Sequence, residues 1–142
     1  MNPGFIYAIG AAIVWGIVYC IDQRVLDAVS PLPLLFLDSL ITAIIMVPFL
    51  FHERHSIKTF LSSGKLNIEL MIASIVLAAL ANFLIFSGIK LLGASSASII
   101  EIMYPFFVVL FSFIFFKNTP NIYFIIGALL VFAGSAMIVY HH

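Results

Sequence analysis

Five long runs of apolar residues, separated by short polar stretches, make up most of the sequence. A helix needs about 20 mainly apolar residues to cross roughly 30 Å of hydrocarbon, and each run approaches that length. The pattern therefore predicts transmembrane helices over residues 5–21, 32–51, 70–89, 94–116 and 122–140. The strands of a membrane barrel alternate apolar and polar residues over about ten positions, so these continuous runs exclude a barrel. We expect an all-α integral membrane protein, a bundle of five transmembrane helices in which residues 1–142 form a single domain.

Prolines, glycines and polar residues mark the ends of the predicted helices. Pro31 and Pro33 open the second helix, and residues 56–67 form the longest polar connection. Gly93 separates the third helix from the fourth, which predicts a tight hairpin. Residues 118–121 form the last turn, with a proline at an early helical position. No basic stretch precedes the first helix and no clean cleavage site follows it, so we expect an uncleaved helix rather than a signal peptide.

The composition excludes several classes of protein. Hydrophobic residues make up 64% of the chain and charged residues only 8%, whereas a soluble domain is about 25% charged. So few charged side chains cannot cover a surface that faces water. The net charge is zero, so a basic face for nucleic-acid binding is not expected. The lone Cys20 cannot form an intrachain disulfide.

The cations are distributed unequally between the two sides of the predicted bundle. The side that holds the N-terminus carries four cations and the opposite side carries two, namely Arg54, Lys58, Lys65 and Lys117 against Arg24 and Lys90. Cytoplasmic loops are enriched in Lys and Arg, so the bias favours a cytoplasmic N-terminus. Because the bias is only two charges, insertion in both orientations stays open.

Glu101 is the most unusual polar residue in the predicted helices. It lies about 10 Å inside the fourth helix, where an ionisable group costs about 2.5–3.5 kcal/mol or more unless it is paired or hydrated. Pro105 follows four residues later and has no N–H to give to the carbonyl of Glu101. Ser98 and Tyr104 lie three residues away on nearby faces. The cluster indicates a substrate or proton site. The alternative is a protonated glutamic acid that packs against a neighbouring helix beside a proline kink.

Other polar or aromatic side chains at membrane depth are candidates for the same site. Trp15, Tyr19 and Asp22 share one face of the first helix and could line a cavity. Asp22 also fits a solvated helix end, which we favour. Asp38 in the second helix fits either the site or a structural hydrogen bond to another helix. Asn82 in the third helix either bonds across helices or faces the cavity.

Small residues recur at spacings typical of close helix packing. One set repeats every four residues along the first helix: Ala8, Ala12, Gly16 and Cys20. Small residues at this spacing let two helix backbones approach closely. Gly127 and Gly134, seven residues apart in the fifth helix, suggest the same role.

No metal site, cofactor or catalytic constellation is expected. His52, Glu53 and His55 lie together in a polar stretch, but without further ligands they suggest a hydrated helix end rather than a metal centre. His141 and His142 are terminal and could be a remnant of an expression tag. The chain contains neither a glycine-rich phosphate cradle nor a Ser/His/Asp set within the predicted helices, so an enzyme is not expected.

Three local strings occur in a characteristic order. Trp15 and Gly16 are adjacent, residues 93–116 read GASSASIIEIMYPFFVVLFSFIFF, and residues 127–134 read GALLVFAG. Taken together, the chain resembles the EamA domain of the drug/metabolite transporter superfamily over essentially its full length. Members of this family usually carry two five-helix halves in inverted orientation and move small metabolites across prokaryotic inner membranes or eukaryotic membranes. The resemblance implies that this chain is one EamA-like repeat that pairs with a second.

Two positions depart from what the resemblance implies. The family often carries an acidic residue where the fourth helix ends, but Asn118 stands there beside Lys117. The related small multidrug exporters carry a glutamate in their first helix, and no acidic residue precedes Asp22 here. A proton-coupled multidrug mechanism is therefore not implied.

The resemblance and the polar cluster together predict a transporter protomer. We expect it to move a small organic solute by alternating access, since repeat halves bind solute near the membrane midplane. The expected partners are that solute, membrane lipid, and either a second copy in a homodimer, which could be antiparallel, or a related half. The expected location is a prokaryotic inner membrane, crossed several times. The alternative function is a non-transporting membrane subunit that scaffolds or regulates another complex.

Overall fold

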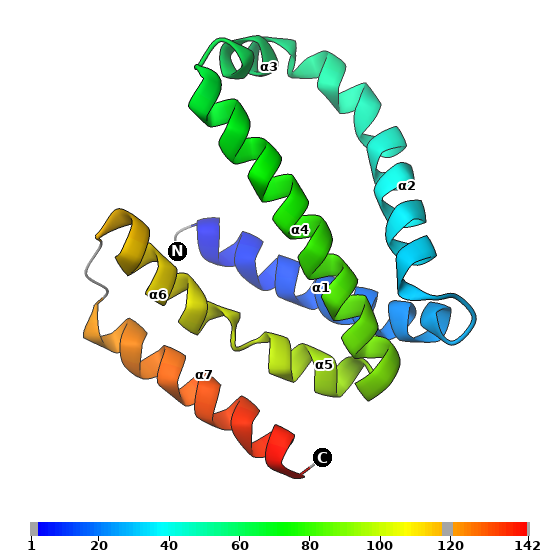
Figure 1. The fold of residues 1–142 in the computed structure, drawn as a ribbon, viewed down its shortest axis with the longest axis vertical. Helices are drawn as coiled ribbons and strands as arrows, with labels where there is room; N and C mark the ends of the chain where they lie inside the picture. The colour runs from blue at the N-terminus through cyan, green and yellow to red at the C-terminus, as the bar shows by residue number, and fades with distance from the viewer. Residues whose placement is uncertain (1–2, 118–120, 142) are drawn as a thin grey trace.

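Seven helices contain most of the residues that the computed structural model describes, 3–117 and 121–141 (Figure 1). In chain order they are α1 (Pro3–Leu26), α2 (Pro31–His52), α3 (Arg54–Leu61), α4 (Lys65–Leu92), α5 (Ala94–Glu101), α6 (Tyr104–Phe116) and α7 (Ile122–His141). These ranges contain no strand. Within them, five stretches are long and apolar enough to cross a membrane, which confirms the all-α membrane fold. The predictions made for Asn118, Pro120 and His142 lie outside the described residues.

Two of the spans extend beyond the apolar runs that predicted them. α1 continues past residue 21 to Leu26, and α4 begins at Lys65 instead of residue 70. Hydropathy marks only the part of a helix that faces hydrocarbon, whereas backbone hydrogen bonding continues into the polar interface. Residues 56–67, predicted as a polar connection, belong largely to α3 and the start of α4. The turn between these two helices contains Gly64, whose φ of 109° favours glycine.

The helices form two arms that meet at one end (Figure 1). α2, α3 and α4 make up one arm, and α5, α6 and α7 lie with α1 in the other. α4 joins the arms because it contacts α2 on one side and both α1 and α5 on the other. The arms diverge from the junction, so that α3 and α6 lie at separate ends of the view.

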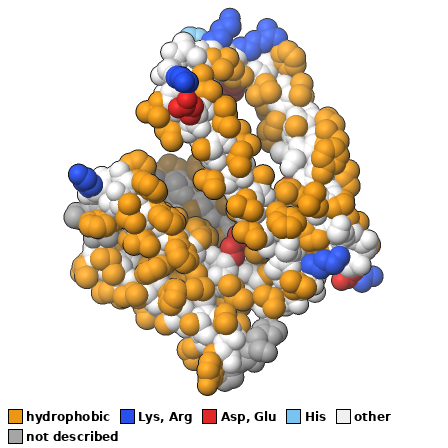
Figure 2. Space-filling model, in the orientation of Figure 1, with side chains coloured by type: hydrophobic (Ala, Val, Ile, Leu, Met, Phe, Trp, Pro, Cys, Tyr) orange, Lys and Arg blue, Asp and Glu red, His pale blue; other side chains and the backbone are white. Residues whose placement is uncertain are grey.

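The largest buried cluster lies at the junction of the arms. It contains side chains from α1, α4 and α5: Tyr19, Leu26, Phe86, Ile89, Ala94 and Ala97. Elsewhere most large apolar side chains are exposed, and hydrophobic side chains cover most of the face in Figure 2. Lipid can cover such an exposed apolar surface. Side-chain packing within the chain therefore holds the helices together mainly at the junction, and less along the rest of their length.

The predicted hairpin between α4 and α5 is present and tightly packed. Gly93 makes the turn with a φ of 81°. A Cβ added at Gly88 would lie 3.7 Å from the Cβ of Ala97, so small side chains let the two helices approach closely. The Nζ of Lys90 donates to the carbonyl of Val29 at 3.0 Å, which ties the end of α4 to the turn between α1 and α2.

Candidate functional site

Glu101 and Tyr19 form a polar contact between two membrane-spanning segments. The Tyr19 hydroxyl on α1 donates a hydrogen bond to Oε2 of Glu101, the last residue of α5. The ring of Trp15, one turn earlier on α1, meets the Tyr19 ring edge-on with centroids 5.6 Å apart. The structure thus brings Glu101 together with Trp15 and Tyr19, which the sequence analysis placed on one face of the first helix.

The backbone breaks directly after Glu101. α5 ends at this residue and α6 begins at Tyr104, so Ile102 and Met103 interrupt the fourth span. Pro105 lies in the first turn of α6, where the absence of an N–H is tolerated. The same missing N–H leaves the carbonyl of Glu101 without its usual helical donor. The break therefore lies where the proline spacing predicts it, and it places the carboxyl at a helix end.

The contact between Tyr19 and Glu101 lies inside the membrane-spanning region, but the Glu101 side of it is exposed on the surface of the chain. Glu101 is seven residues from the start of α5, and Tyr19 is seven residues from the end of α1. At 1.5 Å per residue both lie about 10 Å from the same end of the bundle. Tyr19 is only 9% exposed, whereas Glu101 is an exposed residue. A ligand could therefore reach the carboxyl without first moving a covering side chain of this chain.

α5 is held at two further points by side chains that the sequence analysis did not nominate. The Gln23 side-chain oxygen accepts a hydrogen bond from the N–H of Ala94 at 2.7 Å. The Ser135 hydroxyl on α7 lies 2.8 Å from the carbonyl of Ile99. Gln23 is one turn after Tyr19, so the same face of α1 contacts both ends of α5. No local sequence signal marks either contact, because each depends on how distant helices pack.

Gln23→Leu is expected to lower the thermal midpoint of unfolding. The N–H of Ala94, a buried residue, would lose its acceptor, which costs about 1–3 kcal/mol. Gln23→Glu keeps an oxygen in the same place and should remain close to the wild-type protein. Thermal unfolding in detergent measures both variants. Equal midpoints for Gln23→Leu and the wild type would show that this contact does not hold α5.

Three other residues predicted for the site, Ser98, Tyr104 and Asn82, make no hydrogen bond to Tyr19 or Glu101 in the described part of the chain. The Ser98 hydroxyl turns back to the carbonyl of Ser95 within α5, at 3.0 Å. Tyr104 is exposed and lies close enough to Tyr19 for their side chains to interact electrostatically. Asn82 is half-buried on α4, and its side chain makes no hydrogen bond within the described ranges.

Asp22 and Asp38 lie at a second place, between α1 and α2. Asp38 is exposed, and the two carboxyls are close enough to interact electrostatically. The Oδ2 atom of Asp22 is buried and has no hydrogen-bond partner in the described part of the chain. We favoured a solvated helix end for Asp22, and this prediction is wrong for its Oδ2 atom, which is buried. The reason is that α1 continues to Leu26, which places Asp22 one turn inside the helix end.

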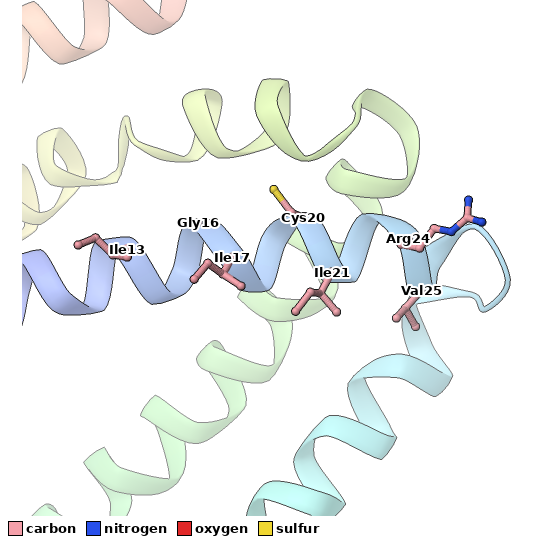
Figure 3. Close-up of a pocket in the computed structure, with 7 residues that line it drawn as sticks. All are labelled: Ile13, Gly16, Ile17, Cys20, Ile21, Arg24 and Val25. Atoms are coloured by element: carbon pink, nitrogen blue, oxygen red, sulfur yellow. The ribbon is translucent and has the colours of Figure 1, made fainter.

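The small residues predicted to pack against other helices do not all do so within one chain. A Cβ added at Gly16, Gly127 or Gly134 would meet nothing within 4 Å. A hollow of about 570 Å³ lies beside Gly16 on α1 (Figure 3). All the residues that line it belong to this helix, from Ile13 to Val25. Since its lining contains no residue of another described helix, this hollow is an open face of α1.

A second hollow of about 340 Å³ lies between α6 and α7, and its lining includes Phe106, Leu110 and Leu129. It contains no titratable side chain. Neither hollow includes Glu101. Among residues 3–117 and 121–141, no group of three potential metal ligands lies together, and Glu53 instead accepts a hydrogen bond from the Ser56 hydroxyl at 2.8 Å.

Comparison with known proteins gives one match, to a family. The model of the EamA-like transporter family matches residues 2–140. Neither the curated proteins nor the solved structures gave a match. The family consists of transporters rather than enzymes, and five apolar spans make the chain an integral, multi-pass membrane protein. With almost the whole sequence matched, the chain belongs to the EamA-like transporter family.

Proposed function

We propose that this chain is one protomer of a transporter that moves a small organic solute across a prokaryotic inner membrane by alternating access. The observation that carries the proposal is the contact between Tyr19 and Glu101. It lies about 10 Å inside the bundle, at a break in the fourth span, and the carboxyl side remains exposed. Ionisable groups at such depth commonly mark substrate or ion pathways.

The geometry around Glu101 argues against a role in packing alone. A carboxyl that only joins helices would be enclosed by the groups it bonds, because an open polar group facing lipid is unfavourable. Glu101 instead has one described hydrogen-bond donor, Tyr19, and an exposed side. The interruption at Ile102 and Met103 lies next to this exposed carboxyl, and both residues keep right-handed helical dihedral angles, so the span is interrupted without being unwound.

The side chains near Glu101 favour a neutral or cationic organic solute. Such a solute can donate a hydrogen bond to the carboxylate in place of the Tyr19 hydroxyl. The ring faces of Trp15 and Tyr104 are available beside it, since both residues are more than half exposed. Aromatic faces attract cations by about 0.5–2 kcal/mol, and they also stack on uncharged rings.

Pairing with a second copy completes the proposal. One chain supplies only one wall around Glu101, and the unpacked small residues of α1 leave a helix face open. Transporter repeats place their solute site between two inverted halves. We therefore propose an antiparallel homodimer in which the stripe of Ala8, Ala12, Gly16 and Cys20 packs against the same stripe of the partner.

Uptake into proteoliposomes tests transport. Reconstituted protein is offered a panel of neutral, cationic and anionic organic solutes of low molecular mass, with empty liposomes as the control. We expect uptake of at least one neutral or cationic solute above the control. Thermal stabilisation by the same solute in detergent would support binding. Uptake of anionic solutes alone would contradict the proposed role of Glu101.

Reporters of membrane orientation and one disulfide test the pairing. Reporters at Asn2 and after Tyr140 are expected to appear on both sides of the membrane, and a single fixed side would exclude the antiparallel homodimer. An antiparallel pair of α1 helices brings Cys20 of one copy level with Ala8 of the other, given the bounds Pro3–Leu26. Ala8→Cys should therefore form an intermolecular disulfide on oxidation. A parallel pair would instead cross-link through Cys20 in the wild type.

A further inference from the structure

The short helix α3 lies across one end of the arm formed by α2 and α4 (Figure 1). It follows the end of α2 at His52 and precedes the start of α4 at Lys65. Because α2 and α4 both belong to membrane spans, α3 lies where those spans leave the hydrocarbon. Its eight residues are too few to cross a bilayer.

The side chains of α3 are segregated by type. Arg54 and Lys58 are four residues apart and lie together on one side of the helix. Ile57 and Leu61 lie on the side that adjoins it, since Leu61 follows Arg54 by two turns. Phe60 lies on the apolar side as well, three residues after Ile57. A helix with one cationic and one apolar face is suited to lie in the plane of the membrane interface.

The two cations of α3 are free of ion pairs in the described part of the chain. The Arg54 guanidinium lies 4.8 Å from the centre of the Phe51 ring, which holds it beside an apolar surface. Neighbouring Lys65 is already paired with Glu69 at 3.4 Å. Figure 2 shows cationic side chains gathered at this end of the molecule.

The cations at the opposite end of the bundle are engaged within the chain. Arg24 pairs with Asp27 at 3.5 Å, and Lys90 donates to the carbonyl of Val29. The two ends therefore differ in available charge as well as in the number of cations. Among residues 3–117 and 121–141, the α3 end is the one that offers two unpaired cations next to an apolar helix face.

We propose that α3 lies in the headgroup layer and binds anionic phospholipid headgroups through Arg54 and Lys58. The phosphate meets the two cations while the acyl chains extend beside the apolar face of α3 and the adjoining spans. A cation near an anionic membrane surface contributes about 1 kcal/mol, and Arg and Lys stems can lie along apolar surface while the charged end stays in water. The lipid is the favoured partner because the charged and apolar faces adjoin each other at the membrane surface.

Native mass spectrometry of the purified chain in mixed micelles tests the proposal. Dihexanoyl phosphatidylglycerol is compared with dihexanoyl phosphatidylcholine at equal concentration. We expect the wild type to retain phosphatidylglycerol preferentially. Arg54→Gln and Lys58→Gln should each weaken that binding about fivefold, the change that corresponds to roughly 1 kcal/mol per cation. Circular dichroism checks that both variants keep the helix content of the wild type.

Two controls separate lipid binding from other causes. Arg24→Gln removes a paired cation at the opposite end and should leave the preference for phosphatidylglycerol unchanged. Glycerol 3-phosphate supplies the anion without acyl chains and should not displace the lipid. The proposal is overturned if both lipids are retained equally, if Arg24→Gln weakens binding as much as Arg54→Gln, or if glycerol 3-phosphate competes effectively. None of these outcomes depends on transport by the chain.

Discussion

Glu101→Gln is expected to reduce solute uptake by about tenfold to a hundredfold while leaving the fold intact. A hydrogen bond to a charged group contributes about 1.5–3 kcal/mol, and each 1.4 kcal/mol corresponds to a factor of about ten. Glutamine keeps the size of the side chain and an oxygen that the Tyr19 hydroxyl can reach. It removes the charge that the solute is proposed to meet. Uptake rates in proteoliposomes, with thermal midpoints in detergent, measure both parts of the expectation.

Glu69→Gln is the matched control for this variant. Glu69 is exposed near the start of α4 and pairs with Lys65, so the same chemical change is made away from the proposed site. We expect uptake by this variant to equal that of the wild type. If Glu101→Gln also transported normally, Glu101 would be a packing residue, and a scaffolding or regulatory subunit would become the better interpretation.

Leu26→Ala is expected to lower the free energy of unfolding by about 2–5 kcal/mol, the usual range for a buried leucine. Leu26 is 1% exposed and belongs to the cluster that joins α1, α4 and α5. Helices in a membrane associate largely through close packing, so a cavity here loosens the junction on which both arms depend. Unfolding of the purified chain in mixed detergent measures the change.

Leu84→Ala provides the comparison for the packing effect. Leu84 lies on α4 and is 60% exposed, so its side chain contacts lipid or detergent instead of the cluster. The same deletion of three carbon atoms should change the unfolding free energy by less than about 0.5 kcal/mol. Equal losses in the two variants would show that the junction has no special importance for stability.

The apolar runs were enough to predict the five spans, because the requirement for about 20 apolar residues is a physical constraint that few other folds meet. The same reasoning misplaced the ends of α1 and α4. It also missed α3, whose alternation of charged and apolar residues appears polar when only mean hydropathy is considered. Its helical spacing, with Arg54 and Lys58 on one side of the helix and Ile57 and Leu61 on the adjoining side, was the signal that could have identified it.

Sequence spacing located the polar cluster on the fourth span and made Tyr19 a candidate for the same site, but it did not pair Tyr19 with Glu101. Glu101 and Pro105 predicted a break in the helix, and the structure has one there. The hydrogen bond from Tyr19 could not be predicted, because 82 residues separate it from Glu101 and no local pattern relates the two helices. The contacts of Gln23 and Ser135 were not predicted for the same reason. Polar side chains are common in such helices, and only the packing of distant helices gives these two their partners.

Labelling of Glu101 by dicyclohexylcarbodiimide tests the central claim most directly. This reagent partitions into membranes and modifies carboxyls that it can reach from the apolar phase, and peptide mass mapping identifies the site. The account predicts that Glu101 is labelled in proteoliposomes and that solutes taken up by the protein slow its labelling. A Glu101 that stays unmodified while Asp38 reacts, or that reacts at a rate no transported solute changes, would contradict it.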